Sequence, residues 1–193
     1  MRARSILLLV LVLPLFSPVL AHADEPAIQI KGAEGTELPA KEEKAVKKTL
    51  TDYLAALQKQ DYRKAGELID RPSLLAAVDP MVATIASDST TRGDAMRKVF
   101  GVSTRDSIEA RSNGDLFNSL MGFMMEANPS AAGVLSKATI DVLAARKMGD
   151  RVHVAYRLTL PPAEPGGMPY EQITAQRLSK FDGKWRILFS LEQ

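Results

Sequence analysis

LSKFDGKWRI, residues 178–187, is the stretch of this 193-residue chain that decides its fold class. Its centre is Asp182-Gly183, which lies between two runs rich in β-forming side chains, residues 172–181 and 184–191. Asp-Gly between such runs is the strongest short-range signal for a β-hairpin, because both turn positions need a positive φ. The sequence therefore predicts that the chain closes on an antiparallel hairpin.

A second hairpin is predicted upstream, where apolar and polar side chains alternate over Thr139 to Lys147 and again over Arg151 to Leu160. Pairing Lys147 with Arg151 across a three-residue loop aligns the apolar positions on one face. A slip by one residue would scatter them, so the pattern favours this register. The expected opposite pairs are Ile140 with Leu158, Val142 with Tyr156, Ala144 with Val154, Asp141 with Arg157, Ala145 with His153 and, in the last hairpin, Leu178 with Ile187.

The first half of the chain has helical periodicity instead. An apolar stripe at a spacing of three to four residues predicts a long helix with one buried face. After it, Asp61 suits the N-cap of a second helix, which we expect to end before Arg71. Pro72 and Pro80 suit the first turns of two further short helices, with Asp79 capping the second. The stripe consists of Val46, Leu50, Tyr53, Leu54 and Leu57, and the second helix turns Tyr62, Ala65, Leu68 and Ile69 inward.

Two more helices are expected before the sheet. Residues 103–106, Ser-Thr-Arg-Asp, have the spacing of a capping box and predict a short helix through Ile108. Asn113 or Asp115 then opens a longer helix that ends before Asn128-Pro129. Its apolar side chains, interrupted by polar ones, favour a core or pocket lining over a membrane-active or partner-binding helix; they are Leu116, Phe117, Leu120, Met121, Phe123, Met124 and Met125. Helices followed by an antiparallel sheet define an α+β fold.

The first 23 residues have the pattern of an export signal. Arg2 and Arg4 supply a positive start, residues 6–16 an apolar core, and Ala21-His22-Ala23 a small-x-small cleavage site. The apolar run is shorter than the roughly 20 residues that span a bilayer, so we expect cleavage after Ala23 and no membrane anchor afterwards. The expected organisation is a signal peptide over 1–23, a flexible segment over 24–39 and a single α+β domain over 40–193.

That organisation predicts a periplasmic or secreted protein. The chain has no cysteine, so neither a lipid attached after the cut nor a disulfide is available. Removing two leader arginines from 25 basic residues leaves 23, equal to the 23 acidic residues. The dense basic cluster at Lys44, Lys47 and Lys48 is interleaved with Glu42 and Glu43, as on a solvated helix face. We therefore expect no nucleic-acid partner.

Metal and nucleotide chemistry lack a motif in this sequence. After cleavage His153 is the only histidine, so zinc, copper or haem sites built from His and Cys are not expected. Residues 88–93 superficially resemble a calcium loop, but Arg92 occupies a ligand position and Val99 the place of the bidentate glutamate. There is no Walker loop, dinucleotide fingerprint or Gly-x-Ser-x-Gly elbow. We expect no cofactor.

Three stretches carry a family resemblance: VKKTLTDYLAAL at 46–57, the helix start Gln60-Asp61-Tyr62, and LSKFDGKWRI at 178–187. In these stretches, and in the order of elements over most of residues 41–192, the chain resembles the nuclear transport factor 2-like superfamily, which includes SnoaL-like and ketosteroid isomerase-like proteins. The resemblance implies that a curved antiparallel sheet wraps the long helix into a cone, a cystatin-like roll, whose interior can hold a small apolar ligand. Residues 87–129 form a longer insertion than the family usually has.

Two functions of different classes fit that resemblance. The favoured one is an exported, soluble, non-catalytic module that binds a small apolar ligand or a partner protein in the cone. The alternative is an isomerase or hydratase that uses a buried carboxylate and a tyrosine of the same pocket. The expected lining is Tyr53, Leu57, Phe117, Met121, Met124 and Tyr156; the candidate carboxylates are Asp70, Asp88, Glu126 and Asp141, and the candidate donors Tyr53, Tyr62 and Tyr156. The resemblance also implies that two copies can pair through the exposed sheet face.

Overall fold

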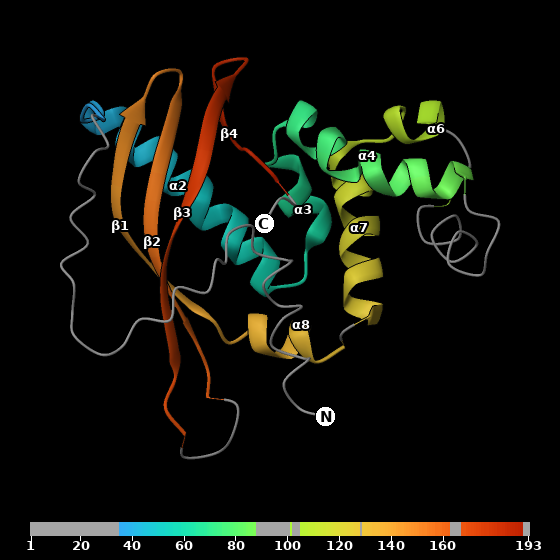
Figure 1. The fold of residues 1–193 in the computed structure, drawn as a ribbon. Helices are drawn as coiled ribbons and strands as arrows, with labels where there is room; N and C mark the ends of the chain where they lie inside the picture. The colour runs from blue at the N-terminus through green and yellow to red at the C-terminus, as the bar shows by residue number, and fades with distance from the viewer. Residues whose placement is uncertain (1–34, 88–100, 102–104, 128, 163–166, 191–193) are drawn as a thin grey trace.

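The computed structural model describes residues 35–87, 101, 105–127, 129–162 and 167–190. Helices come first and a four-stranded antiparallel sheet comes last, so the fold is α+β, as predicted (Figure 1). The helices are α2 (Ala40–Gln58), α3 (Tyr62–Glu67), α4 (Arg71–Ser87), α6 (Arg105–Glu109), α7 (Asn113–Ala127) and α8 (Pro129–Leu135). The strands are β1 (Thr139–Met148), β2 (Arg151–Leu160), β3 (Tyr170–Phe181) and β4 (Lys184–Ile187), in the spatial order β1-β2-β3-β4.

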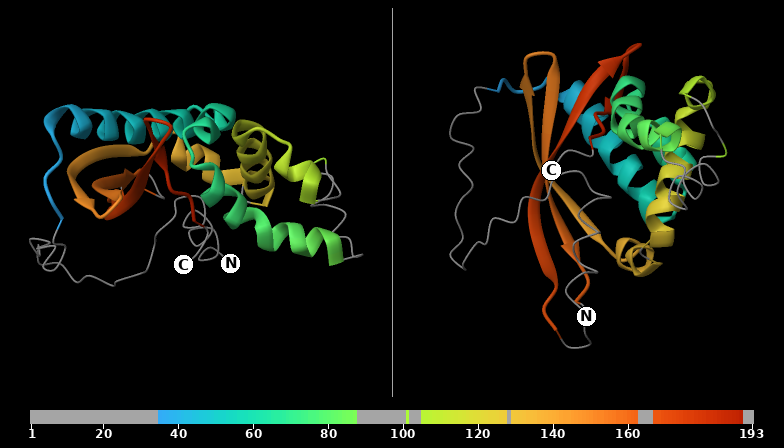
Figure 2. Two further views of the ribbon diagram at one scale, coloured as in Figure 1. Left: turned by 90° about the horizontal axis from the view of Figure 1, so that it is seen from above. Right: turned by 45° about the vertical axis from the view of Figure 1, so that its right-hand side comes forward.

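Helix α2 lies across one face of the sheet, and the sheet curves beneath it (Figure 2). The predicted stripe explains this position, because all five of its side chains are buried. Burying such side chains stabilises the fold by roughly 1.5–3 kcal/mol each. Before α2, Thr36 pairs with Lys147 and Leu38 is buried, so residues 35–39 run along the sheet edge. The rest of the predicted flexible segment lies outside the described residues.

Caps set the starts of α3 and α4. The carboxylate of Asp61 accepts a hydrogen bond from the Lys64 backbone N–H at 3.2 Å, which confirms the predicted N-cap. Asp70 does the same for α4, accepting from the Ser73 N–H at 2.9 Å. Between the two helices, Ile69 pairs in parallel with Ile187 of β4, which ties the helical part of the chain to the last strand.

The prediction of two short helices after residue 71 is wrong, because α4 runs unbroken from Arg71 to Ser87 with Pro80 inside it. A proline cannot donate the hydrogen bond to the carbonyl four residues earlier, here that of Ala76. Ala76 and Pro80 are both exposed, so water can serve that carbonyl instead. The inner side of the same stretch is held by buried Leu74 and Val78, and the helix continues.

Helix α7 packs on α3 and begins where the sequence predicted. Its N-cap is Ser112, whose hydroxyl accepts from the Asp115 N–H at 3.0 Å and donates to the Asp115 carboxylate at 2.9 Å. The two helices approach closely at glycines: a Cβ on Gly66 would lie 2.6 Å from the Asn113 carbonyl oxygen. Helix α6 agrees with the predicted short helix, although residues 103–104 lie outside the described residues. Helix α8 was not predicted.

The predicted register of the first hairpin is correct at its open end and wrong near the turn. Ile140, Asp141 and Val142 pair as expected, but a β-bulge at Leu143 shifts every later pair by one residue. As a result Ala144 pairs with Ala155, Ala145 with Val154, Arg146 with His153 and Lys147 with Val152, instead of the expected Ala144 with Val154 and Ala145 with His153. The extra residue bends the strand and turns Ala145 into the core.

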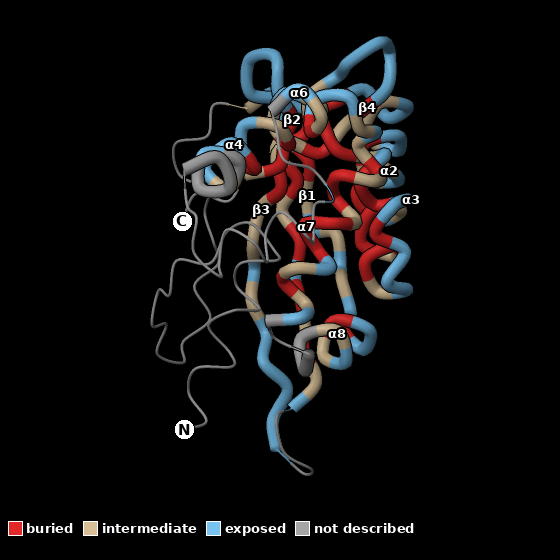
Figure 3. The backbone as a smooth tube through the Cα atoms, turned by 90° about the vertical axis from the view of Figure 1, so that its right-hand side faces the viewer, coloured by how far each residue is buried: buried red, intermediate tan, exposed pale blue. Residues whose placement is uncertain are grey.

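The last hairpin agrees with its prediction. Leu178 pairs with Ile187, and the turn residues Asp182 and Gly183 have φ values of 48° and 73°. Strands β2 and β3 are paired along ten residues each, from Arg151 with Ser179 to Leu160 with Tyr170. Buried residues are concentrated in α2, α3, α7 and the sheet (Figure 3). Within the described residues, no helix is both long and apolar enough to cross a membrane.

Candidate functional site

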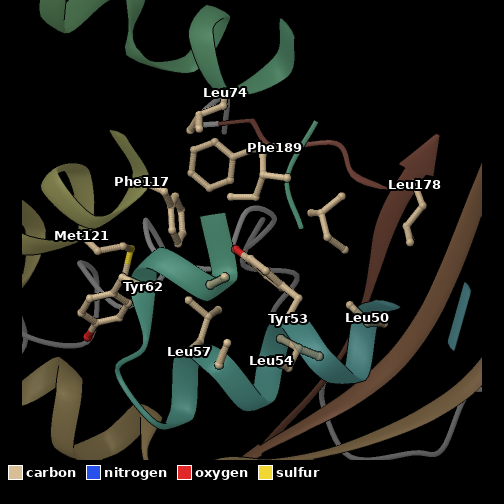
Figure 4. Close-up of a cluster of buried hydrophobic side chains, with 14 of the residues drawn as sticks. Leu50, Tyr53, Leu54, Leu57, Tyr62, Leu74, Phe117, Met121, Leu178 and Phe189 are labelled. Atoms are coloured by element: carbon tan, nitrogen blue, oxygen red, sulfur yellow. The ribbon is translucent and has the colours of Figure 1, made fainter. Parts of the chain in front are cut away.

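The six predicted lining residues all lie in the core. Their exposed fractions are 1% for Tyr53, 0% for Leu57, Phe117 and Met121, 7% for Met124 and 1% for Tyr156. Tyr53, Leu57, Phe117 and Met121 gather in one cluster with Leu74 and Phe189 (Figure 4). The ring of Phe117 lies 6.3 Å from that of Tyr53 and 5.5 Å, edge-on, from that of Phe189, which is the spacing of packed aromatic pairs. That these residues line a ligand site stays a prediction.

The tyrosine hydroxyls in this core are unusual. Within the described part of the chain, the buried hydroxyls of Tyr53 and Tyr62 have no hydrogen-bond partner. Burial, and to a smaller extent the neighbouring Tyr156, raise the pKa of Tyr53. Burial alone raises the pKa of Tyr156 to about 12, so both phenols stay protonated at physiological pH. An unsatisfied buried hydroxyl costs roughly 1–3 kcal/mol.

The candidate carboxylates do not accompany these tyrosines. Asp70 is buried, but its carboxylate caps α4. Glu126 and Asp141 are exposed, and Asp88 lies outside the described residues. No carboxylate in the described ranges bonds to the hydroxyl of Tyr53, which has no partner there. Among the described residues, no candidate carboxylate is therefore hydrogen-bonded to the hydroxyl of Tyr53 or Tyr62.

A different set of residues forms a pocket of about 400 Å³ beside the sheet. One wall is α4, and the other is the outer face of β2 and β3 together with the segment that follows β4. Hydrogen bonds hold that segment in place: the Leu188 N–H donates to the Arg177 carbonyl at 2.9 Å, and the Phe189 N–H donates to the Ser73 hydroxyl at 3.0 Å. The lining consists of Ser73, Ala76, Ala77, Pro80, Arg151, Arg177, Leu188, Phe189 and Ser190.

Basic side chains mark the sheet wall of this pocket. His153 pairs with Arg177 on β3 and lies two residues from Arg151, so all three share the outer face. Burial, then the charges of Arg177 and Arg151, lower the pKa of His153 below its ordinary value of 6.5. Arg151 is 3.9 Å from the carboxylate of Asp150, which is itself 90% exposed. The pocket wall therefore lies in a positive local field.

Sequence reasoning missed this pocket, although one signal for it was readable. Arg151 and His153 alternate along a predicted strand, which put both on the solvent face. Nothing in the sequence shows that residues 188–190 fold back against α4, because that contact depends on hydrogen bonds between distant segments. Among the described residues there is no group of three or more histidine or acidic side chains that could hold a metal ion.

Comparison with known proteins adds little to this geometry. The chain is similar to a Xanthomonas campestris protein of known crystal structure, provisionally assigned as a calcium/calmodulin dependent protein kinase II association domain. The two are 19% identical with a TM-score of 0.31, and the likeness covers 80% of this chain and 89% of that chain. Likeness of this degree carries no functional argument. No family model matches the sequence, and no curated protein is similar to it at a significant level.

The fold and the pocket together define a class of protein: an α+β domain with a pocket of about 400 Å³ whose wall combines arginines with apolar side chains.

Proposed function

We propose that this protein is a non-catalytic binding module that holds a small molecule in the pocket between α4 and the outer face of the sheet. The observation that carries the proposal is the pocket itself. Its volume of about 400 Å³ falls within the range of roughly 300–1,000 Å³ that small-molecule sites occupy. Its lining is mostly apolar with a few polar groups, which is the usual composition of such sites.

The core supports a structural rather than catalytic use of the predicted residues. Tyr53 and Phe117 are almost completely buried and pack against each other. Asp70, the buried candidate base, is committed to a helix cap. These points favour binding over catalysis.

Native mass spectrometry tests the proposal. Protein purified from its own compartment should carry an added mass that denaturation releases. Ala76 is exposed and lines the pocket, so Ala76→Trp should fill the pocket and abolish the added mass. Ala45, an exposed alanine of α2 outside the pocket lining, provides the matched control Ala45→Trp, which should keep it. A bare wild-type mass under several growth conditions, or an unchanged adduct on Ala76→Trp, would contradict the proposal.

Export and self-association belong to the same proposal. Export predicts a mature protein that begins at Asp24, which N-terminal sequencing of the secreted or periplasmic fraction measures. Pairing of two copies would use the outer sheet face, where Leu143 and Ile173 are each 41% exposed. Sedimentation of wild type and Ile173→Asp distinguishes a dimer from a monomer. A full-length N-terminus would contradict export, and a monomeric wild type would contradict pairing.

A further inference from the structure

The pocket wall carries two arginines, and among the described residues their only acidic contact is the exposed carboxylate of Asp150, 3.9 Å from Arg151. Arg151 pairs with Ser179 across β2 and β3, so Arg177 is its diagonal neighbour on the same face. Diagonal neighbours of this kind have Cα atoms about 7–8 Å apart, within reach of two long side chains that converge on one group. None of the nine lining residues that the structure describes is acidic.

The positive charge of this wall is poorly compensated in comparison with other basic residues of the protein. Lys47 lies 2.8 Å from Glu43, and Lys180 lies 2.9 Å from Glu42. Arg177, in contrast, forms no ion pair with any residue that the structure describes. Among the described residues, Arg151 has only the long contact to exposed Asp150. Guanidinium groups bind carboxylates well, since their N–H donors match the two oxygens.

The opposite wall has a different chemistry. Ala76, Ala77 and Pro80 of α4 face Leu188 and Phe189 across the pocket and offer hydrocarbon surface. The Ser73 hydroxyl donates to the Asp70 carbonyl at 2.9 Å and accepts from the Phe189 N–H, so its proton is already committed. The arginines supply the charged donors of the pocket lining.

We propose that the pocket selects a small organic anion, a carboxylate with an apolar body, whose head binds Arg151 and Arg177 and whose body packs on α4. This inference rests on the proposed function, because it names the ligand class of the same pocket. A neutral molecule of the same shape leaves both guanidiniums without a charge partner. An inorganic anion leaves the apolar surface of α4 exposed to water. Only a ligand with both a carboxylate and an apolar body pairs with the arginines and covers the apolar wall.

His153 reports the occupancy of the arginines. It faces Arg177 on β3 and Arg146 on β1, and it follows Arg151 on its own strand. Of these, Arg146 already lies 3.6 Å from the carboxylate of Glu37. A bound carboxylate cancels part of the positive field of Arg151 and Arg177 and therefore raises the pKa of His153 toward its ordinary value.

The experiment is an NMR titration of the full chain at neutral pH with three probes: hexanoate, 1-hexanol and inorganic phosphate. Hexanoate should bind at least about tenfold tighter than either of the other two, because hydrogen bonds to a charged partner are the stronger ones. Arg177→Gln should weaken hexanoate binding by about tenfold or more, with Arg151→Gln as the second variant should the first fail to fold. The control Arg157→Gln removes an exposed arginine of the same sheet face outside the lining and should leave the Kd within about twofold.

Each other outcome is decisive. Equal affinity for hexanoate and 1-hexanol, with shifts at the pocket amides, overturns the anion inference and leaves the proposed function standing. If phosphate binds as tightly as hexanoate, the inference that the ligand has an apolar body is overturned. Absence of shifts at the pocket amides with all three probes overturns the inference together with the proposed function. A hexanoate affinity unchanged in both Arg177→Gln and Arg151→Gln overturns the role of the arginines.

Discussion

The two faces of the sheet are built from the same strands and carry opposite chemistry. On the inner face of β2, Val152, Val154 and Leu158 are completely buried against the helices. On the outer face, Arg151 lines a pocket, and His153 lies two residues further along the strand, opposite Arg177. Because neighbouring residues of a strand point to opposite faces, one ten-residue strand supplies both. Under the proposed function, the inner face accounts for stability and the outer face for binding, so changes to one face should leave the role of the other intact.

The largest effect is expected from the inner face. Phe117→Ala removes a fully buried ring that contacts Tyr53 and Phe189, and should lower the free energy of unfolding by about 3–5 kcal/mol. Phe181, 55% exposed, gives the control Phe181→Ala, expected within about 0.5 kcal/mol of wild type. Urea unfolding measures both. Equal losses for the two variants would break the distinction between the buried and the exposed positions.

A smaller loss is expected where α3 meets α7. A Cβ on Gly66 would lie 2.6 Å from the Asn113 carbonyl and 2.7 Å from the Cβ of Phe117, so Gly66→Ala should force the helices apart and cost about 1–3 kcal/mol. Gly122 of α7 has nothing within 4 Å of such a Cβ, and Gly122→Ala should stabilise by about 0.5–1 kcal/mol. If both substitutions change the midpoint of thermal unfolding in the same direction, the close contact between α3 and α7 is not as described.

Removing a buried tyrosine hydroxyl from the inner face is expected to stabilise the protein. Tyr53→Phe removes a buried hydroxyl that has no described partner, and should raise the free energy of unfolding by about 1 kcal/mol while leaving hexanoate binding unchanged. Tyr170→Phe, at an exposed position where the hydroxyl bonds to Gln172, is the control and should change stability little. Destabilisation by Tyr53→Phe would instead indicate that its hydroxyl serves a partner within the core.

The smallest effect concerns pH and the outer face. The folded protein holds the pKa of His153 below 6.5, so the unfolded chain takes up its proton first as the pH falls. The stability linked to His153 is therefore complete above 6.5 and declines as the pH drops toward the folded-state value. His153→Gln should flatten the stability profile in this window. Glu42 and Glu43, whose pKa values are lowered by Lys180 and Lys47, act only below 4.5. If the pH dependence of stability near pH 6 is the same in His153→Gln and wild type, the positive field of Arg151 and Arg177 at His153 is contradicted.

Local signals in the sequence predicted most of the fold. The stripe from Val46 to Leu57, the cap at Asp61 and the Asp182-Gly183 turn each depend on residues close in sequence, and each is confirmed. The bulge at Leu143 was not predictable from alternation, because alternation assumes an uninterrupted ladder. Pro80 led to the wrong prediction of a helix boundary. It lies inside α4, because an exposed helix face tolerates the missing hydrogen bond.

The candidate site was less accessible to sequence reasoning. Apolar periodicity identifies buried positions such as Phe117 and Met121, but it does not distinguish a packed core from a pocket lining. The pocket needs Ser73 beside Arg177 and residues 188–190, and more than a hundred positions separate Ser73 from each of these. Their meeting depends on tertiary hydrogen bonds that no local pattern encodes.

The measurement that tests the central claim most directly is a map of the backbone amides that shift when hexanoate is added. We expect shifts around the pocket, at Ser73 to Asp79 of α4, at Arg151 and Arg177 of the sheet and at residues 188–190, with the amides of Tyr53, Leu57 and Met121 unchanged. Shifts concentrated instead at Tyr53, Leu57 and Met121 would place the ligand inside the cone and contradict the division between a structural inner face and a binding outer face.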